Sequence, residues 1–186
     1  MPKIYDNLRQ TIVATAKEIV VKDGYRKLNM RQVAKECGIA VGTIYNYFPT
    51  KDELLSELMY GYWMEFISAI QLQQKEEADL FLNLRKIYGI LESFIDTFKD
   101  TWLKANRSEG GMTKEHHRQK DQVVELFVDT IAAAITEYKK GHTKLFENEI
   151  RDRELAAFIV QNFMLISQMK QFEYDTFEKI LKSYFL

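Results

Sequence analysis

Proline occurs only twice in this chain of 186 residues, at Pro2 and Pro49, and this scarcity limits the folds open to it. Proline interrupts helices and central strands because its ring fixes φ and its nitrogen carries no hydrogen to donate. Apolar residues at helical spacing fill the long intervals between the prolines and the eight glycines. The sequence therefore predicts an all-α fold of long helices. A simple coiled coil is disfavoured, because heptad spacing of apolar residues does not persist along the chain.

Turn and capping residues divide the first fifty residues into three helices. Gly24 suits the left-handed position that ends a first helix, and Asn29 is placed to cap a second. Gly38 then turns the chain into a third helix, which Pro49 ends. One longer helix followed by two short helices around a glycine turn is the sequence form of a helix-turn-helix. The three helices are predicted over 6–23, 30–37 and 41–48.

The predicted helices beyond residue 50 are longer. Thr50, Asp152 and Asp175 are placed to cap helices that begin directly after them, and 106–112 (NRSEGGM) is the clearest loop. We expect a helix-turn-helix domain over 1–52 and a larger helical domain over 53–186. The five further helices are predicted over 51–74, 78–105, 113–140, 152–170 and from 175 onward.

Charge is unevenly distributed, although the formal net charge is only −1. Residues 1–52 carry nine Lys and Arg against five Asp and Glu, whereas the remaining residues carry seventeen against twenty-two. A basic N-terminal segment followed by an acidic remainder is typical of a chain that carries a small DNA-binding module, since DNA is a polyanion. A chance fluctuation of four or five charges would give the same pattern, so the charge alone decides little.

Other classes of protein find little support in the sequence. No stretch reaches the roughly 18 apolar residues of a membrane span, and the single cysteine, Cys37, fits a reducing cytoplasm. His117 and Asp121 have the spacing of a metal pair, which a solvated polar face explains more simply. Phosphate loops, dinucleotide fingerprints and CxxC motifs are absent. We expect a cytoplasmic protein that is not an enzyme and has no cofactor, no metal site and no membrane contact.

The segment 29–51, NMRQVAKECGIAVGTIYNYFPTK, resembles the DNA-binding signature of the TetR family of transcriptional regulators. Two positions depart from the family pattern: Ala40 replaces the usual Ser or Thr, and Val41 replaces a residue that is often polar or basic. The resemblance implies a helix-turn-helix that binds a double-stranded DNA operator, followed by an effector-binding and dimerisation domain. The matching residues are Val33, Ala34, Gly38, Ile39, Gly42, Thr43, Ile44, Tyr45, Tyr47, Phe48, Lys51, Glu53, Leu54 and Leu55.

The third helix is the expected recognition helix, because a helix fits the major groove and its N-terminal residues reach the base edges. Val41 could touch a thymine methyl, and Gly42 would let the backbone approach DNA or the preceding helix. Tyr45 and Tyr47 could donate to phosphates or pack within the domain, whereas Ile44 and Phe48 are expected in the core. The predicted DNA contacts are Asn29, Arg31, Gln32, Val41, Gly42, Thr43, Tyr45, Asn46, Tyr47 and Lys51.

Two groups of apolar residues in the larger domain have either a functional or a purely structural interpretation. Aromatic residues between 60 and 127 form either core or a pocket for a small apolar effector, which the resemblance implies in this region. The apolar stripes of the last two helices are either buried within one chain or form a homodimer interface, as the resemblance implies. The pocket candidates are Trp63, Phe66, Tyr88, Phe94, Phe98, Trp102 and Phe127; the interface candidates are Leu155, Phe158, Ile159, Asn162, Phe163, Ile166, Phe177, Ile180, Leu181 and Tyr184.

These features predict a homodimeric repressor that a small, largely apolar effector releases from a near-palindromic operator. A two-fold dimer reads two half-sites, which a single short recognition helix cannot do. The helix that begins at Lys51 joins the two domains and would carry the signal between them. Control by a partner protein, and activation in place of repression, stay open as alternatives.

Overall fold

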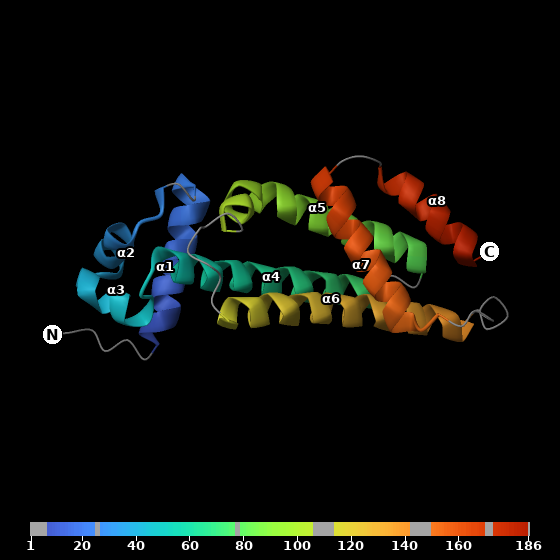
Figure 1. Ribbon diagram of the computed structural model, residues 1–186, viewed down its shortest axis with the longest axis horizontal. Coiled ribbons are helices and arrows are strands. Elements are labelled where there is room, and N and C mark those ends of the chain that lie inside the picture. Colours follow the sequence, from blue (N-terminus) through green and yellow to red (C-terminus); the bar gives the residue numbers. More distant parts are fainter. Residues whose placement is uncertain are drawn as a thin grey trace. The chain divides into compact units, whose positions relative to one another are not determined.

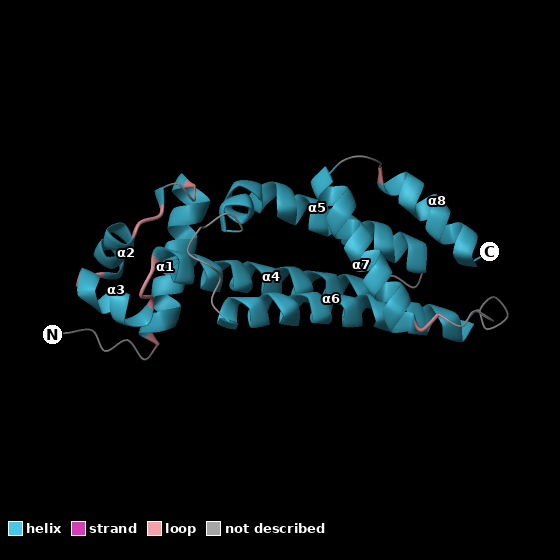
Figure 2. Cartoon of the chain, in the orientation of Figure 1, coloured by secondary structure: helices cyan, strands magenta, loops and turns pink. Residues whose placement is uncertain are grey.

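The computed structural model describes residues 7–24, 27–76, 79–105, 114–141, 150–169 and 173–185. These ranges contain eight helices and no strand (Figure 1, Figure 2), so the predicted all-α class is confirmed. None of the helices in these ranges has both the length and the apolar character that crossing a membrane requires. The helices are α1 (Leu8–Asp23), α2 (Met30–Cys37), α3 (Val41–Tyr47), α4 (Lys51–Glu76), α5 (Leu80–Ala105), α6 (Lys114–Gly141), α7 (Asp152–Met169) and α8 (Tyr174–Phe185).

Local capping explains where the helices of the helix-turn-helix begin and end. The Asn29 side chain accepts a 2.8 Å hydrogen bond from the Gln32 amide, and the Thr50 hydroxyl accepts one of 3.1 Å from the Glu53 amide. Gly38 adopts the left-handed conformation (φ 69°, ψ 32°), and the Ile39 amide donates back to the Ala34 carbonyl. The caps predicted at Asn29 and Thr50 and the glycine turn at Gly38 are therefore confirmed. Gly24 ends α1 with a positive φ of 80°, but its ψ of 158° lies outside the left-handed helical region that was predicted.

Two predicted caps in the C-terminal half are wrong. Asp152 accepts hydrogen bonds from the Thr136 hydroxyl and the Lys139 ammonium of α6, both at 2.6 Å. Asp175 forms a 2.8 Å ion pair with Arg85 of α5. Both carboxylates bind groups on distant helices rather than the first amides of their own helices, so their role is tertiary. The hydrogen bonds from Thr136 and Lys139 also lower the pKa of Asp152 against the opposing effect of its partial burial.

The chain divides into two compact units. The first comprises the residues up to Tyr62 together with 99–116, and the second comprises 63–98 and 117–186. Helix α4 is continuous across the division at Tyr62, so it contributes residues to both units. The expected domain boundary between residues 52 and 53 remains a prediction.

Each unit has its own apolar core. In the first, α1, α2 and α3 group around the start of α4 (Figure 1). Its most deeply buried side chains are Ile12, Ala16, Ile19, Leu28, Val33, Ala34, Ile44, Phe48, Leu54, Leu55 and Leu58.

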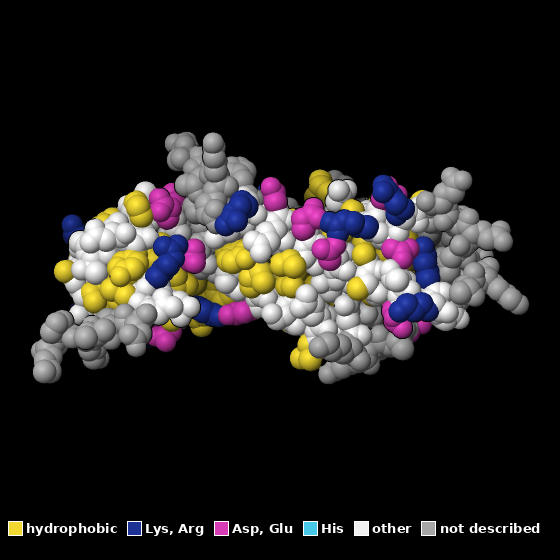
Figure 3. Space-filling view, turned by 90° about the horizontal axis from the view of Figure 1, so that it is seen from below, with side chains coloured by type: hydrophobic (Ala, Val, Ile, Leu, Met, Phe, Trp, Pro, Cys, Tyr) yellow, Lys and Arg dark blue, Asp and Glu magenta, His cyan; other side chains and the backbone are white. Residues whose placement is uncertain are grey.

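In the second unit, acidic and basic side chains lie beside one another on the face drawn in Figure 3. Arg153 of α7 pairs with Glu125 and Asp129 of α6.

Candidate nucleic-acid interface

Helix α3 has one buried side and one exposed side. Ile44 and Phe48, one turn apart, are both completely buried, which confirms their predicted place in the core. Elsewhere on its surface, α3 exposes 36% of Val41, 47% of Tyr45 and 38% of Tyr47, a large apolar and aromatic surface for a helix of seven residues. The two tyrosines therefore present much of their surface to solvent, as a DNA contact requires and as complete burial in the domain would prevent.

Gly42 lies in the first turn of α3 and is exposed. A methyl group built on its Cα would meet no atom within 4 Å, so packing against α2 does not require glycine there. Its φ is not positive either, since the positive-φ glycines of the described residues are Gly24 and Gly38. No contact within the described residues therefore explains the absence of a side chain at this position.

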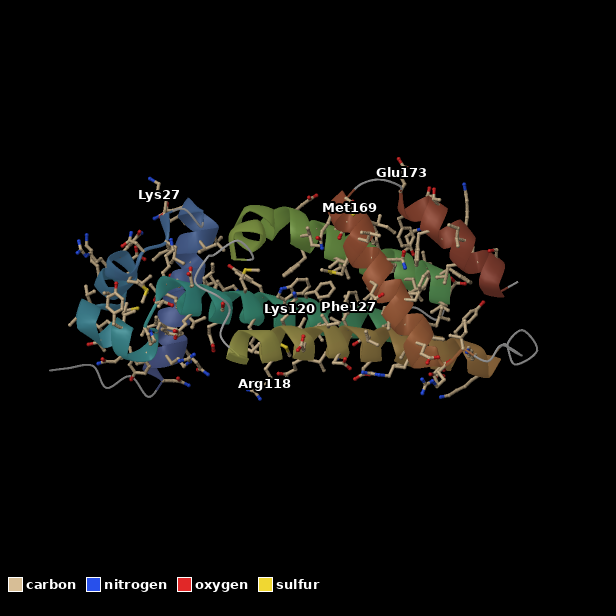
Figure 4. All side chains as sticks on the ribbon, in the orientation of Figure 1. Lys27, Arg118, Lys120, Phe127, Met169 and Glu173 are labelled. Carbon is tan, nitrogen blue, oxygen red and sulfur yellow. The ribbon has the colours of Figure 1, made fainter. Side chains whose placement is uncertain are left out.

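The N-terminal end of α3 has no side-chain cap. Ala40 occupies the N-cap position and supplies no side-chain hydrogen bond, as the departure from the family pattern predicts. The first amides of a helix have no partners within it, and such amides bind anions or other acceptors. Helix α3 carries no charged residue, so cations for phosphate must come from flanking segments. Exposed Lys27 (Figure 4), Arg31 and Lys35 lie on and beside α2, and half-buried Lys51 begins α4.

The remaining predicted contacts differ in how available their side chains are. Asn46 and Arg31 are exposed, and Thr43 is half-buried. The Asn29 side chain caps α2 and also donates to the Lys27 carbonyl at 3.2 Å. The side-chain amide nitrogen (Nε2) of Gln32 donates to the Glu36 carboxylate at 3.1 Å. Asn29 and Gln32 are thus engaged within the domain, and all ten contacts stay predictions.

The predicted pocket residues separate into two aromatic groups within the second unit. Phe66 of α4 packs against Trp63, Phe94 of α5 and Phe127 of α6, with ring centroids 5.1–5.6 Å apart. Phe127, labelled in Figure 4, projects from α6 toward these helices. We name Trp63, Phe66, Phe94 and Phe127 the α4–α6 aromatic cluster. The side chains of Phe98 and Trp102 lie outside the described residues.

Tyr88 belongs to the second aromatic group. Its ring stacks on Tyr174 with centroids 4.7 Å apart and meets Phe163 edge-on at 5.4 Å. Burial raises the pKa of the Tyr88 hydroxyl, and the nearby carboxylates of Glu92 and Asp96 raise it further. This phenol therefore stays neutral at physiological pH and acts as part of the packing between α5, α7 and α8.

The predicted dimer residues are largely covered by their own chain. Phe158 is 51% exposed and Ile180 60%, and Asn162 is half-buried. Leu165 and Met169, which the sequence-based list omitted, are exposed on α7 at 44% and 51% (Met169, Figure 4). The Tyr184 side chain lies outside the described residues. The buried members of the predicted set are Leu155, Ile159, Phe163, Ile166, Phe177 and Leu181.

Phe158, Leu165 and Met169 of α7 and Ile180 of α8 are exposed apolar residues, and we name them the α7–α8 apolar face. Residues 158, 165 and 169 follow helical spacing along α7, which is the signal that extends the sequence-based list. The six buried residues stabilise the fold of one chain, so a partner would contact this face instead. The homodimer itself remains a prediction.

Comparison with known proteins finds a family match for the N-terminal helices. The family model described as bacterial regulatory proteins, tetR family, matches residues 12–58, which span α1 to the start of α4. The fatty acid metabolism regulator protein of Bacillus subtilis is 34% identical over 67 residues, covering 36% of this chain and 34% of that protein. The nucleoid occlusion factor SlmA of Serratia proteamaculans is 24% identical over 184 residues, covering 98% of this chain and 87% of that protein.

The likeness in fold extends beyond the matched domain. The crystal structure of FadR from Bacillus subtilis in complex with stearoyl-CoA has a TM-score of 0.63 at 17% identity, covering 95% of this chain and 97% of that chain. The chain spans at most about half the length of the first curated relatives that it matches. Residues 12–58 of this chain therefore match the DNA-binding domain of the tetR family of bacterial regulatory proteins, and the fold of the chain is similar to that of FadR.

Proposed function

We propose that this protein is a homodimeric DNA-binding repressor that leaves a near-palindromic operator when a small, largely apolar effector binds its larger domain. The exposed surface of α3 is the observation that carries the DNA-binding part. A short helix fixed through Ile44 and Phe48 presents Val41, Tyr45 and Tyr47 outward. That arrangement suits a helix whose N-terminal part enters the major groove.

In this proposal α3 contacts the DNA bases, and the DNA backbone is contacted by Lys51 of α4 and by the tyrosines of α3. Thr43 and Val41 lie in the first turn of α3, where hydroxyl and apolar groups can meet base edges. Lys51 begins α4, so its charge and the helix N-terminus would both face phosphate. Tyr45 and Tyr47 would add hydroxyl donors to phosphate oxygens.

Val41 gives this proposal a test that is specific to this chain. If its side chain covers a thymine methyl, replacing that thymine by deoxyuridine weakens binding about fourfold per half-site, since burying one methyl contributes about 0.8 kcal/mol. The Val41→Ala variant should lose most of that sensitivity. Competition titrations of operators carrying single deoxyuridines measure this, with deoxyuridine placed outside the half-sites as the control. Equal sensitivity in both proteins would remove Val41 from the base contacts.

The α4–α6 aromatic cluster supports an apolar effector. Four large rings from three helices provide apolar surface inside the second unit. The structurally similar FadR was solved with stearoyl-CoA, whose acyl chain is also apolar. Long-chain acyl compounds are therefore reasonable first probes. Because α4 runs from Lys51 through Phe66, an effector that favours one position of α4 would change the position of the recognition helices.

Control by a partner protein is the second candidate. The relative that matches 98% of this chain is named for nucleoid occlusion rather than for transcription. A thermal shift screen with acyl-CoAs and other apolar compounds separates the two candidates. An effector at 100 times its Kd stabilises the folded state by about 2.7 kcal/mol, which raises Tm by several degrees. Such a compound should also lower operator affinity. A Tm that no compound raises would favour the partner protein.

A further inference from the structure

Arg9 of α1 contacts three parts of the helix-turn-helix at once. One guanidinium nitrogen donates to the Tyr47 carbonyl at 3.1 Å, and another pairs with the Glu57 carboxylate of α4 at 3.0 Å. The guanidinium carbon also lies 4.4 Å from the centroid of the buried Phe48 ring. A planar group with donors on two sides and a face for an aromatic ring can make these contacts together, whereas an ammonium cannot.

The contact with the Tyr47 carbonyl lies at the C-terminal end of α3. Tyr47 is the last residue of α3, and the last carbonyls of a helix lack partners within it. A cation there also interacts favourably with the helix dipole. At seven residues, α3 is too short to be stable alone, and Ala40 gives it no side-chain cap at its other end. The position of α3 therefore depends on tertiary contacts at its C-terminal end.

We propose that Arg9 is a positioning residue that fixes the recognition helix to α4 and does not itself contact DNA. Through Tyr47 and Glu57, α1, α3 and the first turns of α4 are held as one body. A second contact between α1 and α4 supports this arrangement, since the Lys17 ammonium lies 4.9 Å from the centroid of the Tyr62 ring. The inference rests on the proposed function, because it assigns to Arg9 the transfer of any α4 displacement to α3.

Arg9→Lys and Glu57→Gln test this assignment against a direct phosphate contact. A phosphate contact would tolerate Lys, and removing Glu57 would strengthen it by releasing the cation. A positioning role predicts instead that each variant weakens operator binding about 5- to 30-fold in a dimer, with no further loss in the double variant. The salt dependence should stay unchanged, and so should affinity for non-specific DNA. Lys22→Gln, which removes an exposed charge from the last turn of α1, is the matched control.

Several outcomes would overturn the proposal. Wild-type affinity in Arg9→Lys, tighter binding in Glu57→Gln, or a salt slope reduced by about one unit in Arg9→Gln would each make Arg9 a phosphate contact. Equal loss of operator and non-specific binding would indicate a general folding defect. Hydrogen exchange of 41–48 tests the positioning without DNA, so it stays decisive if no operator exists. Faster exchange in Arg9→Lys than in Lys22→Gln is expected, and equal exchange would contradict the proposal.

Discussion

Gly42→Ala should abolish most operator binding while it stabilises the protein. Alanine is favoured over glycine in a helix by up to about 1 kcal/mol, and the added methyl meets no atom within 4 Å. The same methyl would stand between the first turn of α3 and the DNA. Losing one close contact costs about 1–3 kcal/mol per half-site, so a dimer should lose at least about 30-fold in affinity.

Gly89→Ala is the matched control for this variant. Gly89 lies within α5, is exposed, and also has no atom within 4 Å of an added methyl. It should raise Tm by a similar amount and leave operator affinity unchanged. Thermal unfolding and fluorescence anisotropy titration measure the two effects separately. Wild-type affinity in Gly42→Ala would show that the start of α3 does not approach DNA closely.

Acidic substitutions on the α7–α8 apolar face should produce monomers. Phe158 and Ile180 expose 51% and 60% of their surface, so Phe158→Glu with Ile180→Glu changes little within one chain. In a homodimer the four introduced carboxylates would be desolvated and close together, which a marginal interface does not tolerate. A monomer holds one half-site, and operator affinity should fall about 100-fold or more because the second contact is no longer intramolecular.

Leu72→Glu controls for the loss of an exposed apolar side chain, since Leu72 on α4 is 62% exposed. Sedimentation velocity should give a dimer for the wild type and for Leu72→Glu, and a monomer for the double variant. A double variant that remains a dimer and binds its operator normally would place the interface elsewhere. A wild type that is itself monomeric would contradict the dimer as a whole.

The helix-turn-helix was largely predictable because its information is local. Asn29 and Thr50 lie within three residues of the amides that they cap, and Gly38 lies within the turn that it forms. The turn-length spacing of Ile44 and Phe48 likewise indicates which side of α3 is buried. Such caps, turns and buried sides can be predicted because the residues that form them are close together in the sequence.

Features that depend on distant residues were not predictable. Arg9 meets Tyr47 and Glu57 across 38 and 48 residues, and no local pattern indicates those partners. Asp175 was expected to cap a helix, but it lies within the first turn of α8 and pairs with Arg85 of α5. An apolar stripe also looks the same whether it packs within a chain or against a second one. For this reason the list of interface candidates contained buried residues such as Phe163 and omitted Leu165.

Whether the protein reads DNA sequence as a dimer can be measured by selecting sites from a random duplex library with the purified protein at physiological salt. We expect recovery of a near-palindromic site whose half-sites are about one helical turn apart or a multiple of it, bound more tightly than random duplex by about 10³-fold or more. Recovery of no sequence above non-specific binding would contradict a dimeric sequence reader, and would favour a helix-turn-helix used for contacts with proteins.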